Sequence, residues 1–251
     1  MIEFNNLSAS KQSTGKYVDV FNPLNGEIVG RVPSASEGML DDALSAAYNI
    51  ANDRKKWLKP YERIAILEKF IVIFKSNFNE ILDITTKEGA KPYLDSKVEV
   101  TRAIDSFQSC IDELKAQSGD VIPMNITPSS ANRIAFSTHE PIGVVVALSA
   151  FNHPVNLTAH QVGPAIAAGC PVIIKPAPDT PLSCFNIIKM LREAGLPENY
   201  AQVVLPVKNE EITKLVTDKR VSFFSFIGNG DVGWMLRSKV AKGVRCALES
   251  K

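Results

Sequence analysis

The sequence predicts an α/β fold built around a doubly wound parallel sheet of about five strands. Two observations lead to this prediction. From residue 141 onward, short apolar runs alternate with stretches in which apolar residues recur at helical spacing. The runs are continuously apolar, which is typical of parallel strands that helices cover on both faces.

Three parts are expected along the chain. Residues 1–118 form strands followed by a helical layer, residues 119–140 form a β-hairpin, and residues 141–251 form the parallel sheet with its helices. The hairpin is predicted from alternating apolar and polar residues around a Pro-Ser-Ser turn. We expect it to be an excursion from the body of the fold, outside the parallel sheet.

The first part is predicted to open with two short strands within residues 17–35, on either side of an Asn-Pro-Leu-Asn-Gly turn. A helix follows Ser36, which is a candidate N-cap. The spacing of apolar residues then predicts one long helix that begins at Pro60 and ends near Gly89. A third helix covers about residues 92–117.

The third part contains the five predicted strands, which are the runs GVVVALSAF, PVIIKP, AQVVL, VSFFSFI and VRCALE. The helices between them are expected at about residues 157–168, 180–194, 209–217 and 231–240. Because a helix separates each strand from the next, the strands are expected to be parallel.

Composition excludes several classes of function. Lys and Arg number 28 against 27 Asp and Glu, so a net charge of +1 predicts no attraction to nucleic acid or to an anionic membrane. The first residues do not resemble a signal peptide, and no apolar run is long enough to cross a bilayer. The cysteines and histidines are too scattered for a disulfide framework or a metal site. A reducing, cytoplasmic location is expected.

Gly228, Gly230 and Gly233 form a G-x-G-x-x-G pattern between an apolar run and a helix-like stretch. This pattern is typical of a loop that presents the amides at a helix N-terminus to a pyrophosphate, with Gly228 allowing the turn. Glu249 follows 21 residues after Gly228, near the spacing of a ribose-binding carboxylate. However, the pattern normally opens the first strand–helix unit of such a fold, and here three units precede it. A tight turn without a ligand therefore remains an alternative.

Longer segments occur in the order found in one enzyme family. They are FNPLNGEIVGRVPSAS, WLKPYERIAILEKF, KEGAKP, EPIGVVVALSAFNHPVNL, GPAIAAGCPVIIKPAPDTPLS, EAGLPENYAQVV and FSFIGNGDVG. Over essentially its whole length the chain resembles the aldehyde dehydrogenase superfamily. The resemblance implies a Rossmann-like domain that binds NAD or NADP, cysteine-dependent oxidation of aldehydes to acids, and a homo-oligomer.

The resemblance also implies roles for residues at the ends of the first two predicted strands of the sheet. Asn152 corresponds to the amide that donates to the developing oxyanion, and Ala150 and Phe151 would line the nicotinamide side. Lys175 corresponds to the lysine that hydrogen-bonds the adenosine ribose, with Ala177 beside it. Read without the resemblance, Asn152 is a turn residue and Lys175 a solvated lysine at a strand end.

Cofactor choice depends on the residue three positions after Lys175. This residue is often Glu in the family, whereas here it is Pro178, so the carboxylate that would repel a 2′-phosphate is missing. Asp179, next to it, could restore the repulsion. NAD and NADP both remain open.

The resemblance gives the glycine-containing loop and the last run a second interpretation. Asn229 replaces a serine that touches the pyrophosphate, and it is expected to act together with Gly228, Gly233 and nearby amides. Glu249 corresponds to the general base that activates water. Because it would be solvent-accessible in this chain, we expect its acidity to be ordinary and its catalytic role to be lost.

In the family the nucleophilic cysteine follows that glutamate by a few dozen residues, in a second domain. We therefore expect this chain to be a cofactor-binding portion that lacks the catalytic domain and is inactive alone. The alternative is a non-enzymatic nucleotide-binding or interaction module, paired with a full-length paralogue or a separate catalytic half. The hairpin at 119–140 corresponds to a subunit-interface element, and its unpaired edges favour association.

Overall fold

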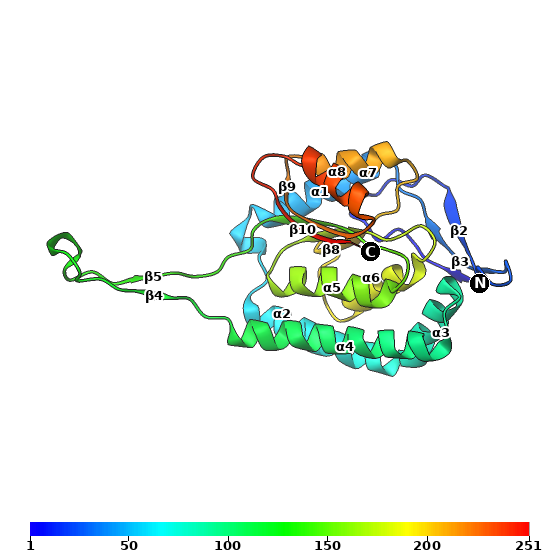
Figure 1. The fold of residues 1–251 in the computed structure, drawn as a ribbon, viewed down its shortest axis with the longest axis horizontal. Helices are drawn as coiled ribbons and strands as arrows, with labels where there is room; N and C mark the ends of the chain where they lie inside the picture. Colours follow the sequence, from blue (N-terminus) through cyan, green and yellow to red (C-terminus); the bar gives the residue numbers. More distant parts are fainter. Residues whose placement is uncertain (251) are drawn as a thin grey trace.

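The computed structural model describes residues 1–250 and contains the predicted parallel sheet (Figure 1). Its strand order is β10-β9-β6-β7-β8, and every neighbouring pair is parallel. The strands are β6 (Val144–Leu148), β7 (Val172–Lys175), β8 (Ala201–Val203), β9 (Val221–Gly228) and β10 (Arg245–Ser250). The predicted fold class is confirmed.

The sheet is doubly wound because its connecting helices lie on opposite faces. α5 (Pro154–Ala167) and α6 (Leu182–Glu193) belong to the hydrophobic core on one face. α7 (Asn209–Thr217) and α8 (Gly230–Lys239) belong to the core on the other face. The chain thus starts at the central strand β6 and moves outward through β7 to β8. It then returns to the other side of β6, where it forms β9 and, at the edge of the sheet, β10. Ligands of such sheets bind where the order reverses, outside the carboxyl ends of these strands.

The first part of the chain forms a small three-stranded sheet and four α-helices. The sheet has the order β1-β3-β2. The elements are β1 (Ile2–Glu3), β2 (Tyr17–Phe21), β3 (Ile28–Pro33), α1 (Glu37–Ala51), a 3₁₀ turn (Arg54–Lys56), α2 (Pro60–Ser76), α3 (Phe78–Gly89) and α4 (Tyr93–Ala116). The two strands expected within 17–35 pair as an antiparallel hairpin. Ser36 caps α1, as predicted, by accepting a hydrogen bond from the Met39 amide at 3.4 Å.

Two details differ from the sequence-based expectation. The single helix expected from Pro60 to Gly89 is two helices that meet at Asn77. The Asn77 side chain donates to the Ile73 carbonyl at 2.8 Å, in addition to the hydrogen bond that this carbonyl accepts from the Asn77 amide at 3.1 Å. The helices also do not form one layer, because α1 packs on the α7/α8 face whereas α2–α4 cover α5 and α6.

Buried ionisable side chains tie α2, α3 and α4 to the helices beneath them. Glu88 of α3 accepts hydrogen bonds from the Leu182 and Ser183 amides at the start of α6, at 2.8 and 3.0 Å. Glu99 of α4 accepts from the first amides of α5. Arg63 of α2 donates to the Ala167 carbonyl at the end of α5. Glu99 and Arg63 carry the sign of charge that stabilises the helix end each one meets, and Glu88 acts through the hydrogen bonds that its carboxyl group accepts.

Burial raises the pKa of the Glu88 carboxyl to about 8, against the opposing effect of three donated hydrogen bonds. The carboxyl therefore keeps its proton in the folded chain at a pH at which the unfolded chain has lost it. Between about pH 4.5 and about pH 8 the folded state binds the extra proton, so stability falls as the pH rises through this window.

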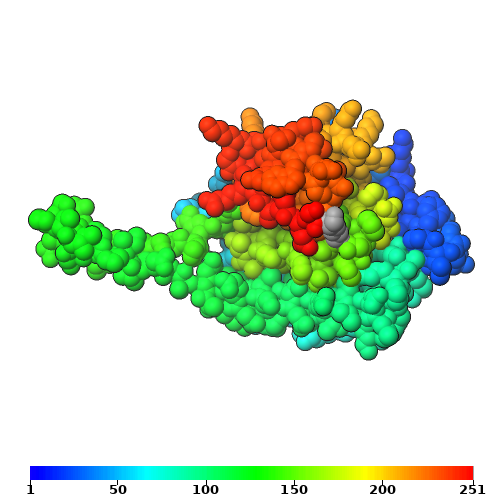
Figure 2. Space-filling model, viewed as in Figure 1, coloured from blue at the N-terminus to red at the C-terminus, as the bar shows by residue number. Residues whose placement is uncertain are grey.

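The predicted hairpin leaves the body of the molecule as a long arm (Figures 1 and 2). Its paired strands are short, β4 (Val121–Ile122) and β5 (Ala135–Phe136), with a 3₁₀ turn (Pro128–Ser130) at the tip. Large apolar side chains along the arm are exposed, including Ile134 at 90%. Across residues 1–250, no helix has the combination of length and apolar character that crossing a membrane requires.

We predict that Glu88→Gln lowers the free energy of unfolding by about 1–3 kcal/mol at pH 5, because an amide cannot accept from both helix amides and Ser183. The variant should also lose the decline in stability between about pH 5 and about pH 8. Urea denaturation at both pH values measures each effect.

Glu80→Gln is the matched control, since Glu80 is an exposed glutamate on the same helix. It should leave both the stability and its pH dependence close to those of the unmodified chain. Equal behaviour of the two variants would contradict the assignment of the pH dependence to Glu88.

Candidate functional site

A groove of about 590 Å³ lies where the carboxyl ends of β6, β7 and β9 meet. This is the place at which the strand order reverses, and the volume is that of an ordinary ligand pocket. The groove brings together seven of the eight residues expected to bind a cofactor, which are Ala150, Phe151, Lys175, Ala177, Pro178, Gly228 and Asn229. The eighth, Gly233, lies just behind the wall.

Lys175 is the last residue of β7 and is half-buried in this groove. Burial lowers the pKa of its ammonium group, and nearby Asp179 partly offsets this effect. The Ser149 amide donates to the Lys175 carbonyl at 3.0 Å, which fixes the strand ends relative to each other. Lys175 therefore presents a half-buried ammonium group to a ligand in the groove.

The N-terminus of α8 forms the opposite wall. Asn229 is its N-cap, and the Asn229 side chain accepts a hydrogen bond from the Val232 amide at 3.2 Å. That side chain thus has a structural partner within the chain. The amides of Gly230 and Asp231 are the first of the helix. Because such amides have no intrahelical acceptor, they favour an anion at this position.

The glycines of this loop are explained by close packing against Phe226. A Cβ atom on Gly233 would lie 2.9 Å from the Phe226 ring, and one on Gly228 would lie 3.0 Å from it. Gly228 ends β9 without a left-handed backbone conformation, so the turn after it does not need the conformational freedom of glycine at this position. The absence of side chains at Gly228 and Gly233 lets α8 approach the sheet.

Other helix N-termini at this edge of the sheet are already occupied. The buried carboxylates of Glu88 and Glu99 fill the starts of α6 and α5. By contrast, α7 and α8 both border the groove, which is lined by Asn209 from the first turn of α7 and Asn229 from the cap of α8. Of the four helices that connect the strands, α7 and α8 are therefore the ones whose first residues border the groove.

Asn152 does not line this groove. It lies in a second cavity, of about 440 Å³, which we call the polar cavity; its lining is Lys91, Asp95, Val98, Glu99, Arg102, Asn152, His153 and Asn156. The Oδ1 atom of Asn152 is buried and has no hydrogen-bond partner. Ala150 and Phe151 border the groove and the next two residues border the polar cavity, so one short segment separates the two spaces.

Glu249 is exposed on β10 and is paired in register with Ile227, which lines the groove. Glu249 itself does not line the groove or the polar cavity. The expected loss of its general-base role therefore stays a prediction, and its side chain is solvent-exposed, as expected.

Sequence reasoning missed the side chains that complete the polar cavity. Asp95, Glu99 and Arg102 follow one another at i, i+4 and i+7 along α4, which is the spacing of one helix face. Lys91 lies just before this helix. The sequence predicts that these three residues share one face of a helix. It does not predict which part of the fold that face contacts, and the cavity depends on this contact.

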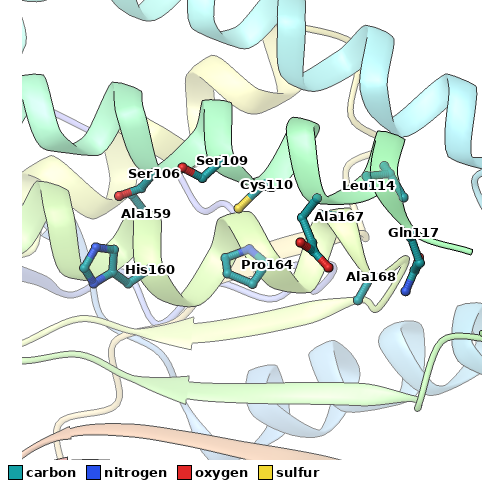
Figure 3. A pocket seen from close by; sticks show the side chains of 11 residues that line it. Ser106, Ser109, Cys110, Leu114, Gln117, Ala159, His160, Pro164, Ala167 and Ala168 are labelled. Carbon is teal, nitrogen blue, oxygen red and sulfur yellow. The ribbon is translucent and has the colours of Figure 1, made fainter.

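A third and larger cavity, of about 680 Å³, lies further along α4 and α5 (Figure 3). Small and apolar side chains such as Ala159, Pro164 and Ala167 form much of it, with His160 at one end. It lies apart from the strand ends, and it does not include the residues predicted to act on a ligand.

The four cysteines are free, and three of them are buried. Burial raises the pKa of Cys110 to about 11 and that of Cys184 to about 12. Thiols with these properties are poor nucleophiles. Within residues 1–250, no group of three or more metal-ligating side chains is suited to a metal ion.

Comparison with known proteins gives consistent matches. Residues 9–250 match the model of the aldehyde dehydrogenase family. The chain is 33% identical over 228 residues to 3-sulfolactaldehyde dehydrogenase from Priestia aryabhattai, covering 91% of this chain and 47% of that protein. The chain therefore spans about half the length of the curated relatives it matches.

Solved structures show the same relationship. Aldehyde dehydrogenase 21 from Physcomitrella patens, in complex with the reaction product succinate, superposes with a TM-score of 0.91 at 35% identity. The match covers 99% of this chain and 52% of that one. The NADP-dependent glyceraldehyde-3-phosphate dehydrogenase from Bacillus halodurans, complexed with NADP, superposes with a TM-score of 0.92 at 27% identity, covering 100% and 53%.

We predict that Gly233→Ala lowers the free energy of unfolding by about 1–3 kcal/mol, because the new methyl group overlaps the Phe226 ring. Phe226→Leu in the same chain should recover part of this loss. Urea denaturation of both single variants and the double variant measures the coupling.

Gly38→Ala in α1 serves as the control, since its Cβ would meet only the flexible end of the Gln12 side chain. It should not destabilise the chain. Additive effects of the Gly233 and Phe226 substitutions would show that the ring does not impose the glycine.

Proposed function

The chain belongs to the aldehyde dehydrogenase family, and from this premise we propose that it is the NAD(P)-binding portion of an enzyme that oxidises an aldehyde to a carboxylic acid. The observation that carries the proposal is the groove at the reversal point of the sheet, which has Lys175 on one wall and the N-terminus of α8 on the other. A dinucleotide requires both features, a donor for its ribose hydroxyls and positive backbone groups for its pyrophosphate.

The residues present fit such a cofactor. Lys175 would donate to the adenosine ribose, and the first amides of α8 would meet the pyrophosphate. Glu88 and Glu99 already accept from the first amides of α6 and α5, whereas the start of α8 borders the groove. When bound, the nicotinamide supplies hydride acceptance. Ala150 and Phe151 would hold the reactive end at the tip of β6.

We propose that the groove accepts NADP as well as NAD. Pro178 places no carboxylate where a 2′-phosphate would lie, and the Lys175 ammonium supplies a favourable charge. Asp179 lines the same groove and opposes that effect, so the preference depends on the balance of two nearby charges.

The aldehyde itself would be handled at Asn152. Its amide lies beyond Phe151, on the polar-cavity side of the segment that separates the two spaces. This position suits donation to an oxyanion. Because Cys110 and Cys184 are buried with raised pKa values, we propose that the attacking thiol comes from outside residues 1–250. Glu249 would gain its basic role only if further residues cover it.

Assembly would use the hairpin arm. Its exposed apolar residues and its unpaired strand edges favour pairing with another polypeptide, a second copy included. The free cysteines fit a reducing compartment, and we propose the cytoplasm.

The test is calorimetric titration of the chain with NADP and with NAD. Lys175→Met should weaken both by about 10- to 100-fold, since it removes a charge-assisted hydrogen bond worth about 1.5–3 kcal/mol. Lys189→Met, an exposed lysine on α6, is the control and should change neither affinity. Absence of binding by the unmodified chain would refute the proposal, and aldehyde-dependent turnover by the chain alone would refute the need for an outside thiol.

The lowered pKa of Lys175 predicts the pH dependence of binding. As the pH rises through this pKa the ammonium loses its charge, so NADP affinity should fall at a lower pH than an ordinary lysine, near 10.4, would allow. The fall should be steeper for NADP than for NAD, because the 2′-phosphate adds charge. Titrations from about pH 7 to about pH 10 measure it, and a flat profile for NADP would contradict it.

A further inference from the structure

We propose that Gln161 is a positioning residue for the groove, and that it sets the distance between the two walls of the groove. The proposal rests on the proposed function, because it takes a dinucleotide as the ligand that contacts both walls. It adds a residue that does not itself line the groove. Gln161 lies on α5, which covers the face of the sheet opposite to α8.

The two walls separate where β6 and β9 stop pairing. The last paired residues are Leu148 of β6 and Phe226 of β9. Beyond them the chain after β6 stays with β7, because the Ser149 amide donates to the Lys175 carbonyl at 3.0 Å. The end of β9 stays paired with β10 instead. The groove therefore opens between a wall that carries Lys175 and a wall that leads from β9 into α8, which we call the Lys175 wall and the α8 wall.

Gln161 connects the two strands at the point where they separate. Its Nε2 atom donates to the Leu148 carbonyl at 3.1 Å. The same atom lies 3.3 Å from the Ser225 carbonyl oxygen and 3.0 Å from the Ser225 hydroxyl oxygen. Leu148 is the last residue of β6, and Ser225 comes one position before the last residue of β9 that pairs with β6. One amide group thus contacts the base of both walls.

The other end of this amide shows that the contact has a cost. Gln161 is 4% exposed, and within residues 1–250 its Oε1 atom is buried without a hydrogen-bond partner. Buried polar atoms are nearly always paired, and an unpaired one is destabilising. The amide cannot turn round to avoid this, because its oxygen would then face two carbonyl oxygens. A side chain such as methionine would avoid the unpaired oxygen, but it could not donate to either strand.

The distance between the walls affects a ligand that contacts both of them. A dinucleotide would contact Lys175 through its adenosine ribose and the first amides of α8 through its pyrophosphate. Walls that are already correctly spaced raise its affinity, because the ligand does not have to order them. Adenosine 2′-phosphate has the ribose and the 2′-phosphate but no pyrophosphate. It therefore contacts the Lys175 wall alone, and its affinity is independent of the spacing.

The test compares NADP with adenosine 2′-phosphate in chemical-shift titrations of the chain. Gln161→Met should weaken NADP binding by about 5- to 10-fold, as expected for the loss of ordinary hydrogen bonds that fix the two strands. The affinity for adenosine 2′-phosphate should change by less than about twofold. The ratio of the two affinities thus distinguishes altered spacing from a general loss of structure, which would weaken the binding of both ligands.

Ser225→Ala is a second variant, and it decides the question if Gln161→Met does not fold. It removes only the hydroxyl contact with Gln161. NADP affinity should therefore fall by about two- to threefold, and the affinity for adenosine 2′-phosphate should stay the same. In the double variant Ser225→Ala should add no further loss, because both substitutions break the same contact.

Thr158→Val is the matched control, since Thr158 is also buried on α5 but its hydroxyl donates within the helix, to the Pro154 carbonyl at 2.7 Å. It should lower the stability of the chain and leave the ratio of the two affinities unchanged. An unchanged ratio in Gln161→Met, or in Ser225→Ala where Gln161→Met does not fold, would overturn the proposal. So would an equal change of the ratio in Thr158→Val. These results leave the proposed function intact if the unmodified chain binds NADP, whereas absence of that binding would refute both proposals.

Discussion

The arrangement of this molecule depends on buried ionisable side chains placed at helix ends. α2, α3 and α4 each deliver one such side chain to a terminus of α5 or α6. Arg63 and Glu99 match the helix dipole in sign, and the Glu88 carboxyl accepts hydrogen bonds from the first amides of α6. Removing one partner would leave a charge or several amides unpaired in the interior, which is costly. The outer helices are thereby fixed to the sheet in one position, more specifically than apolar packing alone would achieve.

The same contacts decide where ligands can bind. Glu88 and Glu99 use the amides that would otherwise receive an anion at α6 and α5. The start of α8, where we propose that a pyrophosphate binds, borders the groove. Glu99 also fixes the first turn of α5, and with it the segment that carries Asn152. Glu99 thus occupies the first amides of α5, which are then not available to an anion, and it also forms part of the wall of the polar cavity.

Local patterns were sufficient for the order of strands and helices from Val144 to Ser250 and for the Ser36 cap, because periodicity and capping act over a few residues. They failed at Asn77, where a side chain competes with the helix backbone. They could not reveal Glu88 or Glu99, whose partners lie 94 and 56 positions away. Asn152 was predicted to act in catalysis from its surroundings in sequence, and this role stays a prediction. Its separation from Lys175 follows from the path of the chain between Phe151 and Pro154.

That path has a consequence for how two occupants would influence each other. Neighbouring residues of one short, irregular segment face opposite spaces, Phe151 toward one and Asn152 toward the other. The Thr180 hydroxyl donates to the Phe151 carbonyl at 3.1 Å and anchors the segment. A ligand in one space that immobilises the segment carrying Phe151 and Asn152 reduces the conformational entropy that a ligand in the other space would have to remove. The binding free energies of the two ligands are therefore linked, and the linkage is reciprocal.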